Sequence, residues 1–218
     1  MIEAAIFDMD GLLIDSEPLW EAAEMVIFPE LGVPLTPVLK KETTGLRTEE
    51  IVDHWHSRYP WAKPSASAVA DRLIRRLIDL VNERGAMRVG VLEALEVCRG
   101  ASLPMAIASS SPMVLIDAVL AKLAVRDYFI AIHSAELEPY GKPHPGVYIA
   151  TARKLGVRPE RCLAFEDSPN GVLAAKAARM SCIAVPDEAL RSHRAFCIAD
   201  RVLDSLLDFD GRVLQRLG

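Results

Sequence analysis

A short apolar segment near the start of the chain ends in two aspartates, and no other feature constrains the fold as strongly. Residues 4–7 (Ala-Ala-Ile-Phe) lie between polar residues, as expected of a strand that is buried on both faces. Because side chains alternate along a strand, Asp8 and Asp10 can lean to one side while Met9 points to the other. Gly11 then permits a sharp turn beside a ligand. Acids at the end of a buried strand are costly to desolvate, so we expect a cation or a reaction to require them.

A calcium-binding loop also begins with Asp-x-Asp, and the next residues test that alternative. Such a loop needs a third ligand where this chain has Leu12 and a glycine where it has Leu13. The sequence therefore excludes an EF-hand at this position.

From residue 90 onward, helical and strand patterns alternate. Apolar segments predict strands at residues 103–108, 128–132, 162–165 and 182–185, with an edge strand at 200–203. The pairs Ser111-Pro112 and Ser168-Pro169 each predict a helix start, since serine is a good N-cap and proline fits the first helical position. A further helix is expected to begin at Pro145 and to end at Gly156. This alternation predicts an α/β fold with a Rossmann-like, mostly parallel sheet and helices on both faces.

Residues 16–84 show helical patterns alone, interrupted by prolines. Thr48 is a candidate N-cap for a helix to about His56, and a long helix should run from about 67 to 84. One face of that long helix is apolar and consists of Val69, Leu73, Leu77, Leu80 and Val81. We therefore predict an α/β core of residues 1–15 and 85–218, with residues 16–84 inserted as a helical cap.

Polar residues follow three of the predicted strands. Asp8, Ser109 and the pair Glu166-Asp167 each stand directly after an apolar segment. In open parallel sheets, ligands bind beyond the carboxyl ends of the strands. The sequence therefore predicts that these residues meet in one crevice.

Four segments, in chain order, resemble the motifs of the haloacid dehalogenase superfamily, in its phosphatase branch. They are Asp8-Met-Asp-Gly11 with Asp15-Ser16, then Ala108-Ser-Ser-Ser111, Lys142-Pro-His-Pro145 and Phe165-Glu-Asp-Ser168. The resemblance spans essentially the whole chain. It is closest to the bacterial 2-deoxyglucose-6-phosphate or hexitol phosphatases, through residues 7–20 and the loop Thr44-Gly-Leu-Arg47.

This resemblance implies phosphoryl transfer, with Asp8 as nucleophile and Asp10 as general acid and then general base. Nearby carboxylates raise one another's pKa, which would help Asp10 to hold a proton. Ser109, Ser110 and Lys142 are the expected phosphate-binding groups.

Four acids beside a phosphate would repel it, so the site should require a divalent cation. Oxygen ligands suit Mg²⁺, and Mn²⁺ or Co²⁺ are candidate substitutes. The expected metal ligands are Asp8, the backbone carbonyl of Asp10 and Asp167, with Glu166 binding directly or through water.

Dehalogenases and phosphonate hydrolases of the superfamily lack the second aspartate, so Asp10 favours the hydrolysis of phosphate monoesters. The similar β-phosphoglucomutases have a cap histidine where this chain has Trp20, which argues against a sugar phosphomutase. A non-catalytic module that binds phosphorylated ligands is a third alternative, although it would not need a nucleophile.

Glu17, Trp20, Gly45 and Arg47 are the candidate substrate contacts from the cap. Arg47 follows a glycine in a predicted loop, where it could bond sugar hydroxyls or simply remain in solvent. Trp20 could contact the substrate or pack within the cap. The expected substrate is a small sugar or sugar-alcohol phosphate.

Composition excludes several classes of partner. The 218 residues carry a formal net charge of −5, which argues against nucleic-acid backbones and anionic membranes. The sequence has no apolar stretch of 18 residues, and its first residues do not resemble a signal peptide, so we expect a cytoplasmic protein. We also expect a monomer. The four cysteines show no Cys-x-x-Cys spacing and should be free thiols.

Overall fold

The structure is a computed structural model and describes residues 1–43 and 45–217. Thr44, part of the predicted loop at residues 44–47, lies outside the described residues. The strands are β1 (Ala4–Phe7), β2 (Met105–Ser109), β3 (Phe129–Ser134), β4 (Cys162–Glu166), β5 (Ser181–Ala184) and β6 (Arg201–Val202). The α-helices are α1 (Glu17–Glu30), α2 (Pro37–Lys40), α3 (Thr48–Arg58), α4 (Ala66–Arg84), α5 (Val91–Gly100), α6 (Met113–Leu123), α7 (Gly146–Leu155), α8 (Pro169–Ala177) and α9 (Gly211–Gln215).

The six strands form one parallel sheet in the order β3-β2-β1-β4-β5-β6. This confirms the predicted α/β fold, and the predicted strands are all present with ends that differ by one or two residues. The chain order reverses on either side of β1, where β2 and β4 are its two neighbours. In open α/β sheets such a reversal leaves a crevice at the carboxyl ends of the strands, which is the usual ligand site.

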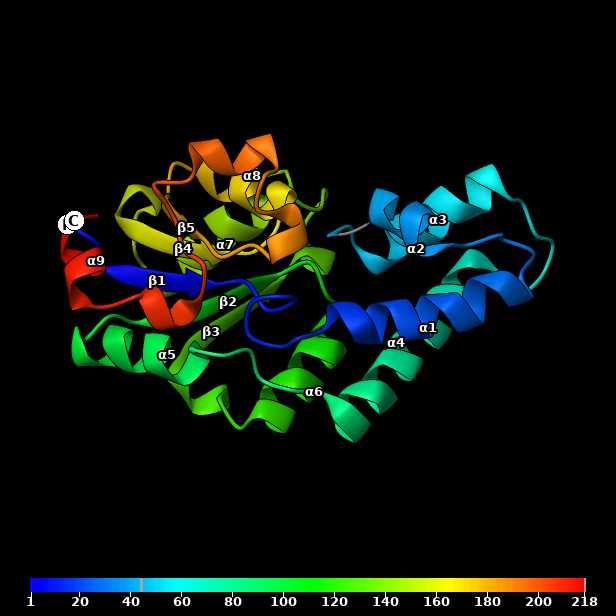
Figure 1. The fold of residues 1–218 in the computed structure, drawn as a ribbon, viewed down its shortest axis with the longest axis horizontal. Coiled ribbons are helices and arrows are strands. Elements are labelled where there is room, and N and C mark those ends of the chain that lie inside the picture. Colours follow the sequence, from blue (N-terminus) through cyan, green and yellow to red (C-terminus); the bar gives the residue numbers. More distant parts are fainter. Residues whose placement is uncertain (44, 218) are drawn as a thin grey trace.

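Alternate residues of β1 face two different layers of helices. Ala5 and Phe7 belong to the larger hydrophobic cluster, together with residues of α5 and α6. Ala4 and Ile6 belong to a second cluster with residues of α7 and α8. Figure 1 shows these helix pairs on opposite faces of the sheet. A strand covered on both faces must be apolar throughout, which explains why residues 4–7 contain no polar side chain.

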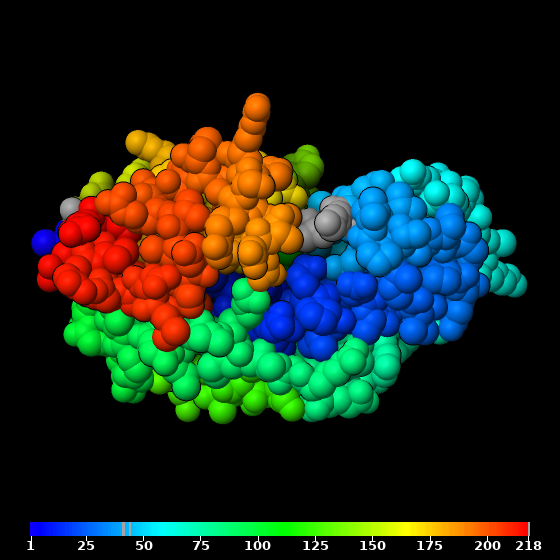
Figure 2. Space-filling view, viewed as in Figure 1, coloured from blue at the N-terminus to red at the C-terminus, as the bar shows by residue number. Residues whose placement is uncertain are grey.

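Helices α1–α4 lie beyond the carboxyl ends of the strands (Figure 1) and form a smaller lobe beside the body that carries the sheet (Figure 2). The five predicted apolar residues of α4 are all buried. Inside this lobe, the ring of Trp55 is fully buried and lies 6.3 Å from that of Phe28. The larger hydrophobic cluster includes residues of both lobes, so their apolar contacts are continuous.

The two segments that connect the lobes run side by side. Ile14 forms an antiparallel bridge with Met87, and the amide of Asp15 donates to the carbonyl of Ala86 at 3.0 Å. Arg88 then bonds Asp187, in the loop after β5, at 2.6 Å. These bonds fix the position at which the chain enters and leaves α1–α4.

Several predicted helix starts are displaced by one residue. Helix α6 begins at Met113 with Pro112 as its N-cap, because the Ser111 hydroxyl donates to a side chain instead of capping the helix. Helix α3 begins at Thr48 with Arg47 as its N-cap, since Glu50 accepts a bond from the Arg47 amide. Helix α7 begins at Gly146 rather than Pro145. The predicted Ser168 cap of α8 is confirmed, because its hydroxyl accepts from the Gly171 amide.

All four cysteines are free thiols, as their spacing predicts. Within the described part of the chain, no helix combines the length and hydropathy that are needed to cross a bilayer.

Candidate active site

A buried lysine organises the crevice at the carboxyl ends of β1 and β4. The Nζ atom of Lys142 lies 2.7 Å from Asp8 Oδ1 and 2.7 Å from Glu166 Oε1. Its third bond goes to the carbonyl of Ala108 in β2, at 3.1 Å. Lys142 is only 4% exposed. Its ammonium has three N–H donors, and three acceptors from the ends of β1, β2 and β4 match them. Although burial lowers the pKa of Lys142, the ion pairs with Asp8 and Glu166 outweigh it and raise that pKa above its usual value.

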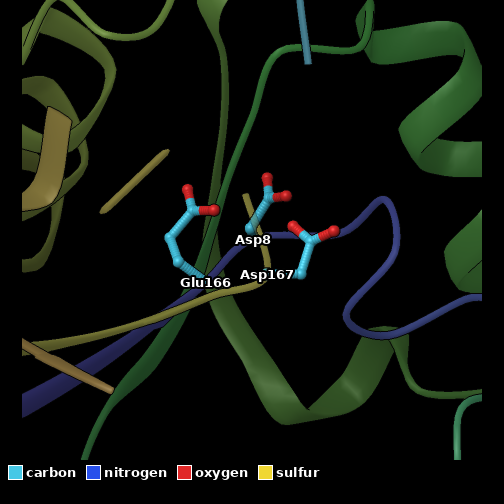
Figure 3. Close-up of side chains that lie close together, drawn as sticks. All are labelled: Asp8, Glu166 and Asp167. Carbon is cyan, nitrogen blue, oxygen red and sulfur yellow. The ribbon is translucent and has the colours of Figure 1, made fainter. Parts of the chain in front are cut away.

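Three carboxylates gather around this lysine. Asp8, Glu166 and Asp167 each offer an oxygen, and these atoms lie within 4.8 Å of one another. Figure 3 shows the three carboxylates turned to the same side of the backbone. Burial is the main cause that raises the pKa of Asp8 to about 7. Lys142 lowers this pKa, and the neighbouring carboxylates raise it. Burial first, then Asp8 and Glu166, also raises the pKa of Asp167 well above its usual value. The cluster thus has more negative charge than one ammonium compensates.

The carboxylates differ in how well they are satisfied. Glu166 accepts from Lys142 and from the Tyr148 hydroxyl at 2.5 Å through Oε1, and from the Ser168 hydroxyl at 3.2 Å through Oε2. In contrast, Oδ1 of Asp167 is buried and has no hydrogen-bond partner among the described residues. A buried carboxylate oxygen without a donor is the environment that a hard divalent cation would satisfy, so Asp8 and Asp167 fit a Mg²⁺ site. Glu166, already bonded through both oxygens, fits better as a ligand through water.

Two glycines allow backbone to approach these acids closely. Gly11 has a φ of +73°, and a Cβ there would lie 2.1 Å from Asp167 Oδ2. The predicted sharp turn beside the site is therefore present. Gly171, in the first turn of α8, would place a Cβ 1.9 Å from the carboxyl carbon of Glu166.

Asp10 lies three residues beyond the end of β1 and is held by side chains from two directions. Its Oδ1 accepts from the Trp20 indole at 3.1 Å, and its Oδ2 accepts from the Ser111 hydroxyl at 2.7 Å. One partner comes from the α1–α4 lobe and the other from the sheet-bearing body. Asp10 is therefore held at the boundary between the lobes, whereas Asp8 is bonded to Lys142.

The serines after β2 have different environments. Ser109 is fully buried, and its hydroxyl accepts from the Ser111 amide at 3.0 Å. Ser110 faces the cavity and lies 3.4 Å from the carbonyl of Gly45. Ser110 and Ser111 line the cavity between the lobes, and the phosphate-binding roles of Ser109 and Ser110 stay predictions.

A cavity of about 50 Å³ lies between the two lobes. Its lining residues include, from the predicted set, Asp8, Asp10, Glu17, Trp20, Gly45, Ser110, Lys142 and Asp167. This volume is well below the roughly 300–1,000 Å³ of common ligand pockets.

Arg47 does not line this cavity, and its environment does not support the predicted substrate contact. Its guanidinium donates to Glu50 at 2.8 Å through Nη2 and, through Nη1, to the carbonyl of Glu138 at 3.1 Å and that of Ala135 at 3.3 Å. The last two bonds cross from the α1–α4 lobe to the loop after β3. Arg47 therefore ties the lobes together instead of facing the cavity.

Four further residues of the site were not predicted as such: Ser111, Tyr148, Glu24 and Lys40. The spacing of Glu24 did contain a signal, since it follows Glu17 by seven residues and Trp20 by four, on the same helix face. Lys40 and Tyr148 reach the site only through tertiary packing. Nothing in their local sequence distinguishes them from ordinary surface and core residues.

Comparisons with known proteins agree with this geometry. A model of the haloacid dehalogenase-like hydrolases matches residues 2–179. Hexitol phosphatase B from Escherichia coli (strain K12) is 46% identical over 214 residues, which cover 98% of this chain and 96% of that relative.

Solved structures of related proteins have a similar fold. A crystal structure of a CbbY variant from Rhodobacter sphaeroides, in complex with xylulose-(1,5)bisphosphate, has a TM-score of 0.85 at 30% identity, covering 95% of this chain and 96% of that one. The β-phosphoglucomutase of Clostridium difficile has a TM-score of 0.89 and covers 100% of this chain and 97% of its own. Its 23% identity supports similarity of fold alone.

The contact between Gly171 and Glu166 predicts the effect of Gly171→Ala. The added methyl must displace the Glu166 carboxylate and with it a partner of Lys142. We expect a loss of about 1–3 kcal/mol in unfolding free energy, measured by urea denaturation. The matched control is Gly211→Ala, at the start of α9, where a Cβ meets nothing within 4 Å. Equal stability of the two variants would contradict the proposed close approach.

The bonds of Arg47 across the lobes predict a loss that does not depend on the substrate. In Arg47→Ala, kcat/KM should fall by a similar factor, about ten-fold, for a sugar phosphate and for p-nitrophenyl phosphate. A Glu49→Ala variant, at an exposed position in the helix that Arg47 caps, serves as the control. A loss confined to the sugar phosphate would restore Arg47 as a substrate contact.

Proposed function

The chain belongs to the haloacid dehalogenase-like hydrolases, and from this we propose that it is a Mg²⁺-dependent phosphatase of small sugar or sugar-alcohol phosphates. The observation that carries the proposal is the environment of Asp8. This carboxylate stands at the end of β1, with Lys142 on one of its oxygens and the acids of β4 beside it. Asp10 lies two residues further on, at the boundary with the α1–α4 lobe.

Asp8 would act as the nucleophile. The bond from Lys142 goes to Oδ1, which leaves Oδ2 to attack phosphorus. The new Oδ2–P bond forms as the ester P–O bond breaks, and Asp10 gives its proton to the departing alkoxide. In the second half-reaction, Asp10 takes a proton from a water molecule as the water oxygen attacks phosphorus. The Oδ2–P bond then breaks, which releases phosphate and restores the Asp8 carboxylate.

Asp10 is well placed for both transfers. Trp20 and Ser111 hold its two oxygens from opposite sides, which fixes the plane of the carboxylate. The leaving group must lie toward the α1–α4 lobe, since the sheet-bearing body occupies the other side. The same orientation therefore serves the proton donor in the first half-reaction and the proton acceptor in the second.

The metal ligands in this proposal are Asp8, Asp167 and the backbone carbonyl of Asp10, with Glu166 through water. When bound, Mg²⁺ would offset the negative charge of the carboxylates and of the phosphoryl oxygens. The residues themselves supply the rest: Lys142 orients Asp8, while Tyr148 and Ser168 orient Glu166.

Helices α1–α4 are proposed to act as the cap that selects the leaving group, with residues 16–84 as the inserted unit and residues 1–15 and 85–218 as the core. The relatives support a carbohydrate leaving group, since one is called a hexitol phosphatase and another binds a sugar bisphosphate. A mutase would require a hexose bisphosphate to remain phosphorylated, and a binding module would not release phosphate. We retain the expectation of a monomer.

The role of Asp8 predicts the behaviour of Asp8→Asn. Turnover, measured as phosphate release from sorbitol 6-phosphate, should fall below about 1% of wild type, because the amide is not a nucleophile. The unfolding temperature in EDTA should equal or exceed that of wild type, since the substitution removes a desolvated charge from an acidic cluster. Turnover above that level would indicate direct attack by water.

The acidic cluster predicts strict dependence on a divalent cation. Activity should vanish after exhaustive chelation and return with Mg²⁺, and Mn²⁺ or Co²⁺ should restore part of it. Asp167→Asn should raise the Mg²⁺ concentration for half-maximal activity by about ten-fold or more, whereas Asp53→Asn, on the exposed face of α3, should not. Full activity of the chelated enzyme would contradict the metal assignment.

A further inference from the structure

The wall of the cavity that α1 and α2 form contains an acid that the proposed reaction does not use. Glu17, Trp20 and Glu24 project from one face of α1 and line the cavity together with Lys40, at the end of α2. Glu24 is only 2% exposed. An acid buried to this degree in the middle of an apolar helix face is rare unless it has a partner.

Glu24 lacks such a partner. Its Oε2 is buried and has no hydrogen-bond partner within residues 1–43 and 45–217. The nearby ammonium of Lys40 is bonded to Glu17 at 2.5 Å. An unsatisfied buried oxygen costs about 1–3 kcal/mol, so a group that supplies its missing hydrogen bond would bind there favourably.

The electrostatic surroundings favour an uncharged occupant. Burial is the main cause that raises the pKa of Glu24 to about 7; Lys40 lowers it, and Glu17 and Glu21 raise it further. A neutral carboxyl group can both donate and accept a hydrogen bond, as a hydroxyl group does. Of the described lining residues, the cations are Lys40 and Lys142, and both are already bonded to carboxylates. The wall therefore has no unpaired cation to compensate a second phosphate.

We propose that Glu24 is a specificity-determining residue: its carboxyl group exchanges hydrogen bonds with a hydroxyl of the leaving group, so that this enzyme prefers monophosphates of neutral polyols and discriminates against sugar bisphosphates. The inference rests on the proposed phosphatase function and extends it to the part of the substrate that does not react. The Glu17–Lys40 pair borders the same wall and offers further donors and acceptors to neighbouring hydroxyls. Trp20 lines the same cavity and donates to Asp10.

Glu24→Leu and Glu24→Gln test the proposal as a pair. Leucine has a similar size but no hydrogen-bonding group, and it removes an unsatisfied polar atom, so the variant should fold and its unfolding temperature should not decrease. Glutamine keeps a donor and an acceptor. For sorbitol 6-phosphate, we expect kcat/KM to fall by about 10- to 1,000-fold in Glu24→Leu and by less than about ten-fold in Glu24→Gln.

Two comparisons separate substrate recognition from a structural role. On p-nitrophenyl phosphate, which has no hydroxyl at this end, Glu24→Leu should lose at least ten-fold less than it does on sorbitol 6-phosphate. Glu30→Gln, at the exposed end of the same helix, is the matched control and should resemble wild type on both substrates. Wild type should also hydrolyse fructose 6-phosphate at least about ten-fold more efficiently than fructose 1,6-bisphosphate.

The outcomes distinguish this inference from the proposed function. If wild type hydrolyses p-nitrophenyl phosphate but none of the polyol and sugar phosphates, both are overturned. If wild type is active on sorbitol 6-phosphate but Glu24→Leu is unchanged, or loses equally on both substrates, the role of Glu24 alone is overturned. A bisphosphate hydrolysed as well as its monophosphate would overturn the predicted discrimination.

Discussion

The site depends on one desolvated ammonium. Lys142 bonds the nucleophile candidate after β1, the acid that ends β4 and a carbonyl of β2, so a single side chain sets the relative positions of three adjacent strands at their carboxyl ends. Its removal would leave Asp8 and Glu166 buried without a cation, which costs several kcal/mol per unpaired charge. The sheet order supports this arrangement, because the strands beside β1 are those that supply the other partners.

The lysine does not compensate the whole acidic cluster, and this imbalance connects structure to function. Within residues 1–43 and 45–217, Asp167 has an oxygen without a donor, and glycines at positions 11 and 171 allow backbone to approach the acids closely. A fold that maximised its own stability would replace one of these acids by an apolar residue. The chain instead retains a crevice where, in the proposed function, a cation and a phosphate would complete the missing interactions, which is the usual relation between local instability and a binding site.

Much of this could be predicted from the sequence, because the strand ends carry the signal. The apolar segments locate the strands, and the rule that ligands bind at their carboxyl ends brings Asp8, Glu166 and Asp167 together correctly. Helix starts were less predictable, since Ser111 bonds Asp10 instead of capping α6. The contacts of Arg47 were hard to predict for a similar reason: a loop arginine can reach many acceptors, and only the tertiary structure shows that its Nη1 bonds carbonyls after β3.

The cavity wall of the α1–α4 lobe was the hardest part to predict, and the reason is physical. The groups that bind phosphate must be charged and must stand at fixed strand ends, so they form local motifs. The groups that face the leaving group need only present hydrogen bonds to hydroxyls, and any helix that packs there can carry them. Glu24 shares its helix with buried apolar residues and is distinguished by the seven-residue spacing from Glu17. An acid on the apolar face of α1 is therefore a candidate for reading the leaving group, because its burial without a hydrogen-bond partner has a free-energy cost that a bound hydroxyl would reduce.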